Sequence, residues 1–309
     1  MPGRVAAFTG EVYCLGYDNC PSLTHMTIYD TRHNSRPIVV TADDGRELPA
    51  TWYLPGERPR GAVLIAPAMA TPARFYSAFA WWLAGHGYAT LTFDYRGMAS
   101  RAAMKAETGD LVRWFGDAAS ALERLVDDAP DVPVTWLGHS LGGQALPFAR
   151  HDLVDRALLV ASGTGYWRES APAVRYRAPI FFRAVVPLAI RATGYYPGRR
   201  LGLLGDVPPN VMRQWTRWCM RGYFADVADL EARVAELELP ITALSFTDDE
   251  LLSAANHHAL EELYAAAPVE AHRVSPGDLG VERIGHHGFF RADMAPAWEQ
   301  LVLPYLATG

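Results

Sequence analysis

Short apolar runs alternate with amphipathic stretches over most of the chain. Residues 37–41 and 48–53 flank the turn Ala42-Asp43-Asp44-Gly45, a pattern that predicts a β-hairpin. Further apolar runs predict strands at residues 62–66, 89–93, 134–137, 157–160, 241–246 and 270–274. Helices are predicted around residues 73–84, 110–127 and 295–306. This alternation is typical of an α/β fold, with a mostly parallel central sheet and helices on both faces.

Two stretches depart from the alternation. Residues 1–35 show neither a strand period nor a helix period, so we expect an irregular N-terminal segment, with the main domain over residues 36–309. The gap at about residues 163–237 is too long for a simple crossover. It carries its own aromatic residues, namely Trp167, Phe181, Phe182, Tyr195, Tyr196, Trp215 and Trp218. We interpret it as an inserted helical lid.

The segment Gly138-His139-Ser140-Leu141-Gly142 follows the predicted strand at residues 134–137 and precedes a helix. This G-x-S-x-G pattern predicts a nucleophile elbow, in which small residues let the backbone bend sharply around the serine. Ser140 is therefore the candidate nucleophile. The backbone N–H of Leu141, the next residue, is a candidate oxyanion donor.

A serine hydroxyl needs a histidine base and an orienting carboxylate. In folds with a nucleophile elbow of this kind, these follow the serine along the chain in the order acid, then histidine. Thr247-Asp248-Asp249-Glu250 follows the strand at residues 241–246, and we prefer Asp249 as the acid, with Asp248 as the alternative. The later segment Gly285-His286-His287-Gly288 offers two imidazoles. His286, directly after glycine, is preferred to His287.

The second oxyanion donor is expected in the loop Ala66-Pro67-Ala68-Met69-Ala70-Thr71-Pro72. Proline has no N–H, so the donor is the amide of Met69 or Ala68, of which we prefer Met69. Among the other histidines, His139 is expected to fill space in the elbow, and His257 and His258 to lie on a helix surface. We find no clustered metal ligands in the sequence and expect neither a metal nor a cofactor.

Net charge, cysteine spacing and the lengths of the apolar runs limit the protein's expected partners and location. The 309 residues carry a formal charge of -6, and the isoelectric point is near 5.9, so no nucleic-acid partner is expected. Cys14, Cys20 and Cys219 lack the spacing of a zinc site and are expected to be small buried or terminal thiols. Residues 1–25 contain no unbroken apolar run of the signal-peptide kind, and residues 178–190 fall short of a membrane span. A cytoplasmic location without a spanning helix is expected.

Several motifs resemble those of the α/β-hydrolase superfamily, and in particular a group of bacterial hydrolases related to the serine aminopeptidase and monoacylglycerol-lipase-like branch. Beyond the elbow, Phe93-Asp94-Tyr95-Arg96-Gly97 is similar to the turn after the fourth strand of that group. Residues 111–117 are similar to its helix before the elbow, and residues 285–290 to its histidine loop. Asp94 and Arg96 are expected to brace loops. The loop at Ala66-Pro67 departs from the superfamily's common His-Gly pair.

These features together predict a serine hydrolase that cleaves a carboxylic ester, or a related acyl bond, of a small apolar molecule. The lid aromatics and the pair Trp81-Trp82 suggest an apolar pocket, although the same residues also fit a role in the core. An acyltransferase on the same triad and a non-catalytic binding member of the fold are the alternatives. Neither the natural substrate and its acyl chain length nor the oligomeric state follows from the sequence.

Overall fold

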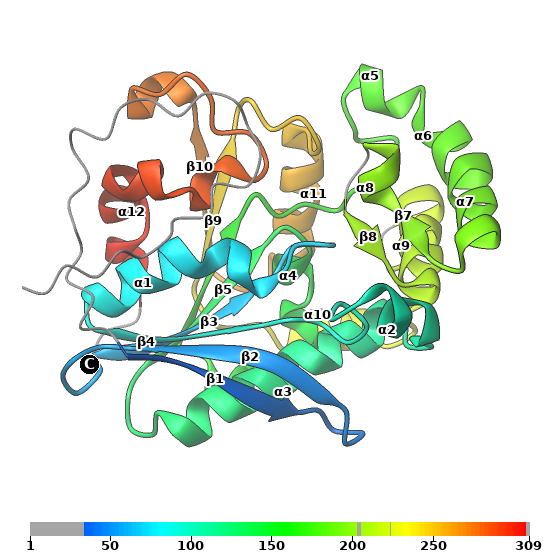
Figure 1. Ribbon diagram of the computed structural model, residues 1–309. Helices are drawn as coiled ribbons and strands as arrows, with labels where there is room; N and C mark the ends of the chain where they lie inside the picture. Colours follow the sequence, from blue (N-terminus) through cyan, green and yellow to red (C-terminus); the bar gives the residue numbers. More distant parts are fainter. Residues whose placement is uncertain (1–33, 203–204, 223, 307–309) are drawn as a thin grey trace, which may run out of the picture. The chain divides into compact units, whose positions relative to one another are not determined.

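The computed structural model describes residues 34–202, 205–222 and 224–306 (Figure 1). Eight of its strands form one sheet in the spatial order β1-β2-β4-β3-β5-β6-β9-β10. Their bounds are β1 (Asn34–Thr41), β2 (Glu47–Leu54), β3 (Gly61–Ala66), β4 (Tyr88–Phe93), β5 (Val134–His139), β6 (Arg156–Val160), β9 (Ile241–Phe246) and β10 (Val269–Val274). Strand β2 runs antiparallel to β1 and β4, and the other neighbours pair in parallel. The predicted hairpin and mostly parallel sheet are confirmed.

Helices cover both faces of this sheet. The described helices are α1 (Ser77–Gly85), α2 (Arg101–Ala106), α3 (Leu111–Asp128), α4 (Leu141–Gln144), α5 (Pro172–Arg175), α6 (Ala178–Ile180), α7 (Val186–Thr193), α8 (Gly198–Leu201), α9 (Pro209–Arg221), α10 (Leu230–Ala235), α11 (Ala254–Leu263) and α12 (Ala295–Leu301). Figure 1 shows α1 and α12 on one face and α3 on the other, and the buried apolar side chains accordingly form two clusters. The final helix is shorter than predicted, because α12 ends at Leu301 and a 3₁₀ turn, η8 (Leu303–Tyr305), follows it.

Of the two tryptophans of α1, Trp82 belongs to the core and Trp81 is partly buried against it. Trp82 is 2% exposed and packs edge to face against Trp298 of α12, with ring centroids 5.4 Å apart. Trp81 packs against Tyr53 of β2 at 5.2 Å. These contacts favour a role in the core for this pair.

The turn after β4 is tied to the rest of the sheet by a buried ion pair. The guanidinium of Arg96 contacts Asp117 of α3 at 2.5 Å and Asp44 of the hairpin turn at 2.7 Å. Burial raises the pKa of Asp117 and outweighs its bonds to Arg96, which act in the opposite direction. At the exposed Asp44, the bond from Arg96 lowers the pKa to about 2. Arg96 thus braces three segments, as expected from the sequence.

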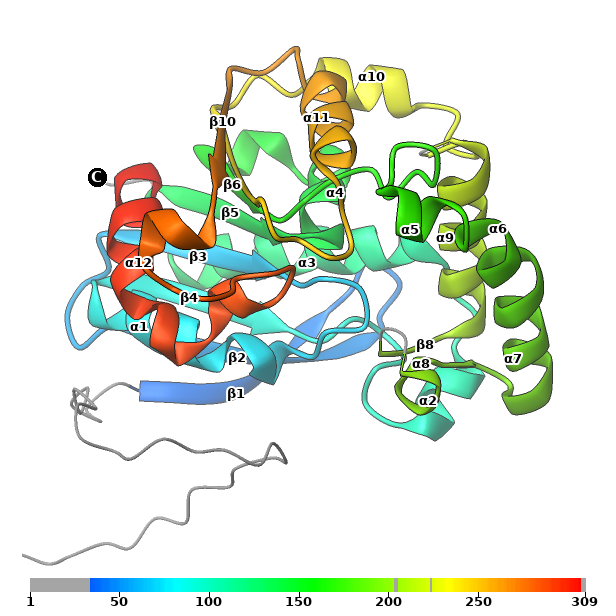
Figure 2. The same cartoon turned by 90° about the horizontal axis from the view of Figure 1, so that it is seen from above.

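The segment between β6 and β9, in which the lid is predicted at about residues 163–237, is largely helical. It contains α5 to α10 and a two-stranded ribbon of β7 (Tyr196–Pro197) and β8 (Asp206–Val207) (Figure 2). Between α6 and α7 lies a π-helical turn, η4 (Phe181–Val185), just before Pro187, which has no N–H to donate. The described helices include none that is both long and apolar enough to span a membrane.

Strand β1 begins at Asn34, two residues before the expected boundary, and residues 1–33, with Cys14 and Cys20, lie outside the described part of the chain. Cys219 is a buried free thiol on α9, as expected, and burial raises its pKa.

Candidate active site

Ser140 lies at the sharp turn between β5 and α4, with φ 51° and ψ −108°, a region that non-glycine residues rarely adopt. The turn leaves no room for side chains on its glycines. A Cβ on Gly142 would lie 2.0 Å from the carbonyl oxygen of Ala66, and one on Gly138 would lie 2.5 Å from the backbone nitrogen of Gly143. The predicted nucleophile elbow is thus present as a backbone conformation, with Ser140 partly exposed at its apex.

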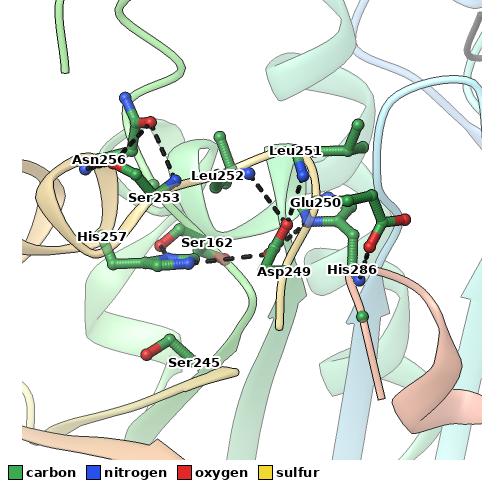
Figure 3. Close-up of polar contacts among 12 residues, drawn as sticks. Ser162, Ser245, Asp249, Glu250, Leu251, Leu252, Ser253, Asn256, His257 and His286 are labelled. Carbon is green, nitrogen blue, oxygen red and sulfur yellow. Dashed lines mark hydrogen bonds and ion pairs between the residues drawn. The ribbon is translucent and has the colours of Figure 1, made fainter. Parts of the chain in front are cut away.

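Asp249 and His286 contact each other directly. The Nδ1 of His286 lies 2.7 Å from Oδ2 of Asp249, and the two side chains are 3% and 0% exposed (Figure 3). The other carboxylate oxygen accepts backbone N–H bonds from Leu251 at 2.8 Å and Leu252 at 2.9 Å. Burial alone would raise the pKa of Asp249, but the bond and charge of His286, with the two backbone amides, lower it on balance. An ionised Asp249 keeps the proton of His286 on Nδ1 and leaves Nε2 as the basic nitrogen.

The acids on either side of Asp249 bind the backbone of the histidine loop. Oδ2 of Asp248 accepts N–H bonds from Ile284 at 2.9 Å and Gly285 at 3.1 Å. Oε2 of Glu250 accepts the N–H of His286 at 3.2 Å. Three consecutive acids therefore hold one loop, and among the described residues Asp249 alone contacts the imidazole of His286 by a hydrogen bond.

His287 points elsewhere. Its Nε2 lies 3.5 Å from the hydroxyl of Thr71, and its ring packs edge to face against Phe75 with centroids 5.9 Å apart. Burial, followed by the charge of His286, lowers its pKa to about 4. The two imidazoles that the sequence left as alternatives thus have different surroundings: His286 meets a carboxylate, and His287 remains neutral beside the loop after β3.

A chain of hydrogen bonds joins that loop to the histidine loop through the residue before the nucleophile. The N–H of Ala68 donates to the hydroxyl of Tyr76 at 2.9 Å, and this hydroxyl lies 2.8 Å from Nδ1 of His139. The Nε2 of His139 lies 2.9 Å from the carbonyl oxygen of His286. A carbonyl only accepts, so His139 carries its proton on Nε2 and accepts at Nδ1 from Tyr76. Burial lowers the pKa of His139, which keeps it neutral. Sequence reasoning treated His139 as a filler and missed this link.

The same bonds distinguish the two candidate oxyanion donors. The amide of Ala68 is occupied by Tyr76, whereas the amides of Met69 and Leu141 have no hydrogen-bond partner within residues 34–202, 205–222 and 224–306. The turn after β4 braces this loop: the hydroxyl of Tyr95 donates to the carbonyl of Pro67 at 3.2 Å. Further along the loop, Asp94 accepts the N–H of Ala73 at 2.7 Å.

His139, His286 and His287 bring ring nitrogens within 4.8 Å of one another, a cluster that the sequence did not indicate. Adjacent residues of one loop and a residue from the elbow meet here only because of the fold. His139 is committed at both nitrogens to Tyr76 and to the His286 carbonyl, so it has no free lone pair for a metal. The donors of this cluster therefore do not suit a metal ion.

His257 corrects an expectation from the sequence. It was expected on a helix surface, yet it is 2% exposed on the inner side of α11, whereas His258 is exposed. The Nδ1 of His257 donates to the carbonyl of Ser162 at 2.7 Å, and its Nε2, buried without a hydrogen bond to any described residue, lies 3.7 Å from Oδ2 of Asp249 (Figure 3). The acid is thus flanked by two imidazoles, of which His286 makes the hydrogen bond.

Comparisons with known proteins agree with this architecture. The model of the family described as serine aminopeptidase, S33, matches residues 57–275, a range that includes Ser140 and Asp249 and ends before His286. The chain belongs to this family of α/β hydrolases. No curated protein matches the sequence.

Similar solved structures share the fold at low sequence identity. A hydrolase from Pseudomonas aeruginosa is 18% identical with a TM-score of 0.54, over 87% of this chain and 97% of that one. An esterase from Pyrococcus furiosus is 12% identical with a TM-score of 0.57, over 89% and 92%. An α/β hydrolase from a Penicillium species is 16% identical with a TM-score of 0.58, over 86% and 96%. These likenesses, together with the strand order, support the α/β-hydrolase fold that the motifs predicted.

Proposed function

We propose that the chain is a serine esterase in which Ser140, His286 and Asp249 form the catalytic triad, acting on carboxylic esters of small apolar molecules. The observation that carries the proposal is the 2.7 Å contact of His286 with a buried, ionised Asp249. The loop that holds His286 is itself bonded to His139, the residue before Ser140. A base, its orienting acid and an elbow serine are the elements that acyl transfer requires.

The reaction proceeds in two halves. The hydroxyl oxygen of Ser140 attacks the ester carbonyl carbon while its proton passes to Nε2 of His286, and the imidazolium is stabilised by Asp249. The tetrahedral intermediate then expels the alcohol, which takes the proton back from His286. Water, deprotonated by the same nitrogen, attacks the acyl-serine. The second intermediate then releases the acid product, and the Ser140 oxygen takes the proton back from His286.

The amides of Met69 and Leu141 bind the oxyanion of both intermediates. Each donor of this kind contributes about 3 kcal/mol to transition-state stabilisation. The bond from the Ala68 amide to Tyr76 supports Met69 rather than Ala68 in this role. Tyr76 and His139 act as positioning residues, since they fix the oxyanion loop and the histidine loop to each other.

A parallel substrate screen tests the proposal. Esters of short and long acyl chains, a lactone, a thioester and an amide are offered to the wild type and to Ser140→Ala. We expect the wild type to hydrolyse at least one of the esters and Ser140→Ala to hydrolyse none of them. Turnover that survives in the purified variant contradicts the assignment, and formation of a new ester in the presence of an added alcohol assigns acyltransferase activity instead.

A further inference from the structure

The helical segment between β6 and β9 differs in charge from the rest of the chain. Residues 163–222 contain ten arginines and two acidic residues, a formal charge of +8, within a chain of -6. Both acidic side chains are engaged locally: Glu169 accepts a bond from Thr164 at 2.5 Å, and the buried Asp206 accepts the N–H of Arg199 at 3.1 Å. The remaining residues carry the compensating formal charge of -14.

One helical run in this segment has apolar side chains on both of its faces. From Ala178 to Thr193, through α6, η4 and α7, the inner face is formed by Ala178, Phe182, Val186 and Ile190. The opposite face is exposed and consists of Ile180, Arg183, Ala184, Pro187, Leu188, Arg191 and Ala192. Ile180 is 69% exposed and Leu188 65%, and Tyr176, just before the run, is 74% exposed. An ordinary surface helix carries polar residues of mixed charge on its outer face.

This surface carries two arginines of the exposed face and Arg177 just before the run. Arg177, Arg183 and Arg191 are exposed and form no ion pair with any residue in the described part of the chain, whereas Arg217 on α9 contacts Asp226 at 2.9 Å. Figures 1 and 2 both place α6 and α7 on the side of the segment that faces away from the central sheet. Three guanidinium groups and three large apolar side chains therefore share one accessible surface.

An open groove beside this surface has the same mixed character. It lies between α7 and α9, encloses about 340 Å³, and is lined by Phe182, Val186, Pro187, Ile190, Arg191, Arg213 and Thr216. Arg191 and Arg213 supply the positive charge, and the other lining residues are apolar apart from the hydroxyl of Thr216. A ligand that fits such a groove has an anionic group joined to an apolar chain.

We propose that Tyr176, Arg177, Ile180, Arg183, Leu188 and Arg191, here named the basic apolar face, bind the surface of an anionic phospholipid bilayer. Guanidinium groups pair with lipid phosphates, and the apolar side chains between them enter the boundary between headgroups and acyl chains. Such a surface therefore offers partners both to the arginines and to the exposed apolar side chains. The acidic remainder of the chain is repelled by it, so the protein binds by this face alone. Binding does not depend on the proposed esterase activity, which adds only that membrane lipids or their products are suitable substrates.

Vesicle sedimentation with the full chain tests the proposal. Vesicles of phosphatidylcholine alone are compared with vesicles that contain phosphatidylcholine and phosphatidylglycerol in equal parts. The wild type is expected to bind only the anionic vesicles, less strongly as salt is raised. Removing one arginine weakens such binding roughly fivefold, so Arg183→Gln/Arg191→Gln is expected to bind roughly 25-fold more weakly. Arg36→Gln/Arg58→Gln, which removes the same charge from exposed sites outside the segment, is the matched control and binds as the wild type does.

A second pair of variants separates lipid insertion from simple anion binding. Ile180→Gln/Leu188→Gln leaves every charge in place, and because both positions are exposed, the fold is expected to be retained. This double variant is also expected to lose binding to anionic vesicles. Equal binding to both vesicle types, no binding to either, or equal binding by the two arginine double variants overturns the proposal. If Arg183→Gln/Arg191→Gln or Ile180→Gln/Leu188→Gln changes the oligomeric state, the basic apolar face is assigned to contact with a second copy of the chain. Ser140→Ala is expected to bind anionic vesicles as the wild type does. Vesicle binding and esterase activity are therefore tested separately, and failure of one proposal does not decide the other.

Discussion

Replacing Asp249 by asparagine changes the proton position on His286 without changing the shape of the site. Oδ1 of Asp249 accepts two backbone N–H bonds, from Leu251 and Leu252, so the asparagine oxygen is expected to occupy that position. The amide NH₂ then faces His286 in place of Oδ2 and donates to Nδ1. The proton of His286 moves to Nε2, which can no longer accept the proton of Ser140. A loss of this kind in a serine triad lowers kcat by roughly 10⁴-fold, or about 5 kcal/mol of transition-state stabilisation.

Asp248→Asn is the matched control. Both N–H bonds to Asp248 end on one oxygen, Oδ2, and an amide oxygen in that place accepts them equally well. We therefore expect kcat to change less than tenfold. A modest loss of stability is expected from the NH₂ group, which replaces an Oδ1 that is buried without a hydrogen bond to any described residue. Steady-state hydrolysis of the best ester from the screen, with thermal unfolding of both variants, measures the contrast. Equal losses in the two variants, or a larger loss in Asp248→Asn, would refute the tautomer argument.

Three further predictions address the neighbours of this pair. His286→Ala is expected to abolish both ester turnover and reaction with a fluorophosphonate, whereas His287→Ala keeps most of each; the reverse ranking moves the base to His287. Tyr76→Phe leaves the Ala68 amide and His139 Nδ1 without a partner, so urea unfolding is expected to show a loss of about 3 kcal/mol, and an unchanged value contradicts the hydrogen-bond chain. The pKa of His287 is lowered to about 4 by burial, so the unfolded state binds its proton first as pH falls. Stability is thus lost from about pH 6.5 down to about 4, and His287→Gln is expected to lose about 3 kcal/mol less over this range; a loss equal to that of the wild type contradicts the assignment.

Strongly patterned elements could be predicted from the sequence. The strand at residues 241–246 is a continuous buried run and was found with its exact bounds, and the helix predicted at residues 110–127 is α3, capped by Asp110. The elbow was predictable for a different reason, since its glycines are required by backbone contacts at Gly138 and Gly142. These features depend on local pattern or on sterics, which the sequence carries directly.

Features that depend on the direction of a side chain could not be predicted. His257 was misplaced because a polar residue at a buried helix position breaks the hydrophobic period from which burial is judged. The different partners of Asp248, Asp249 and Glu250 arise from how one turn meets the histidine loop, and adjacent residues give no sequence signal for this. The bonds from Ala68 through Tyr76 to His139 join three separate segments, and nothing in the spacing indicated them.

The role of Ser140 as nucleophile can be tested by finding the residue with which an activity-based probe reacts. The folded wild type is treated with a fluorophosphonate, and the labelled peptide is identified by mass spectrometry. We expect a single adduct on Ser140, absent from Ser140→Ala and strongly reduced in Asp249→Asn. An adduct on another serine, or no reaction of the folded wild type, would contradict the assignment of Ser140 as the nucleophile of this enzyme.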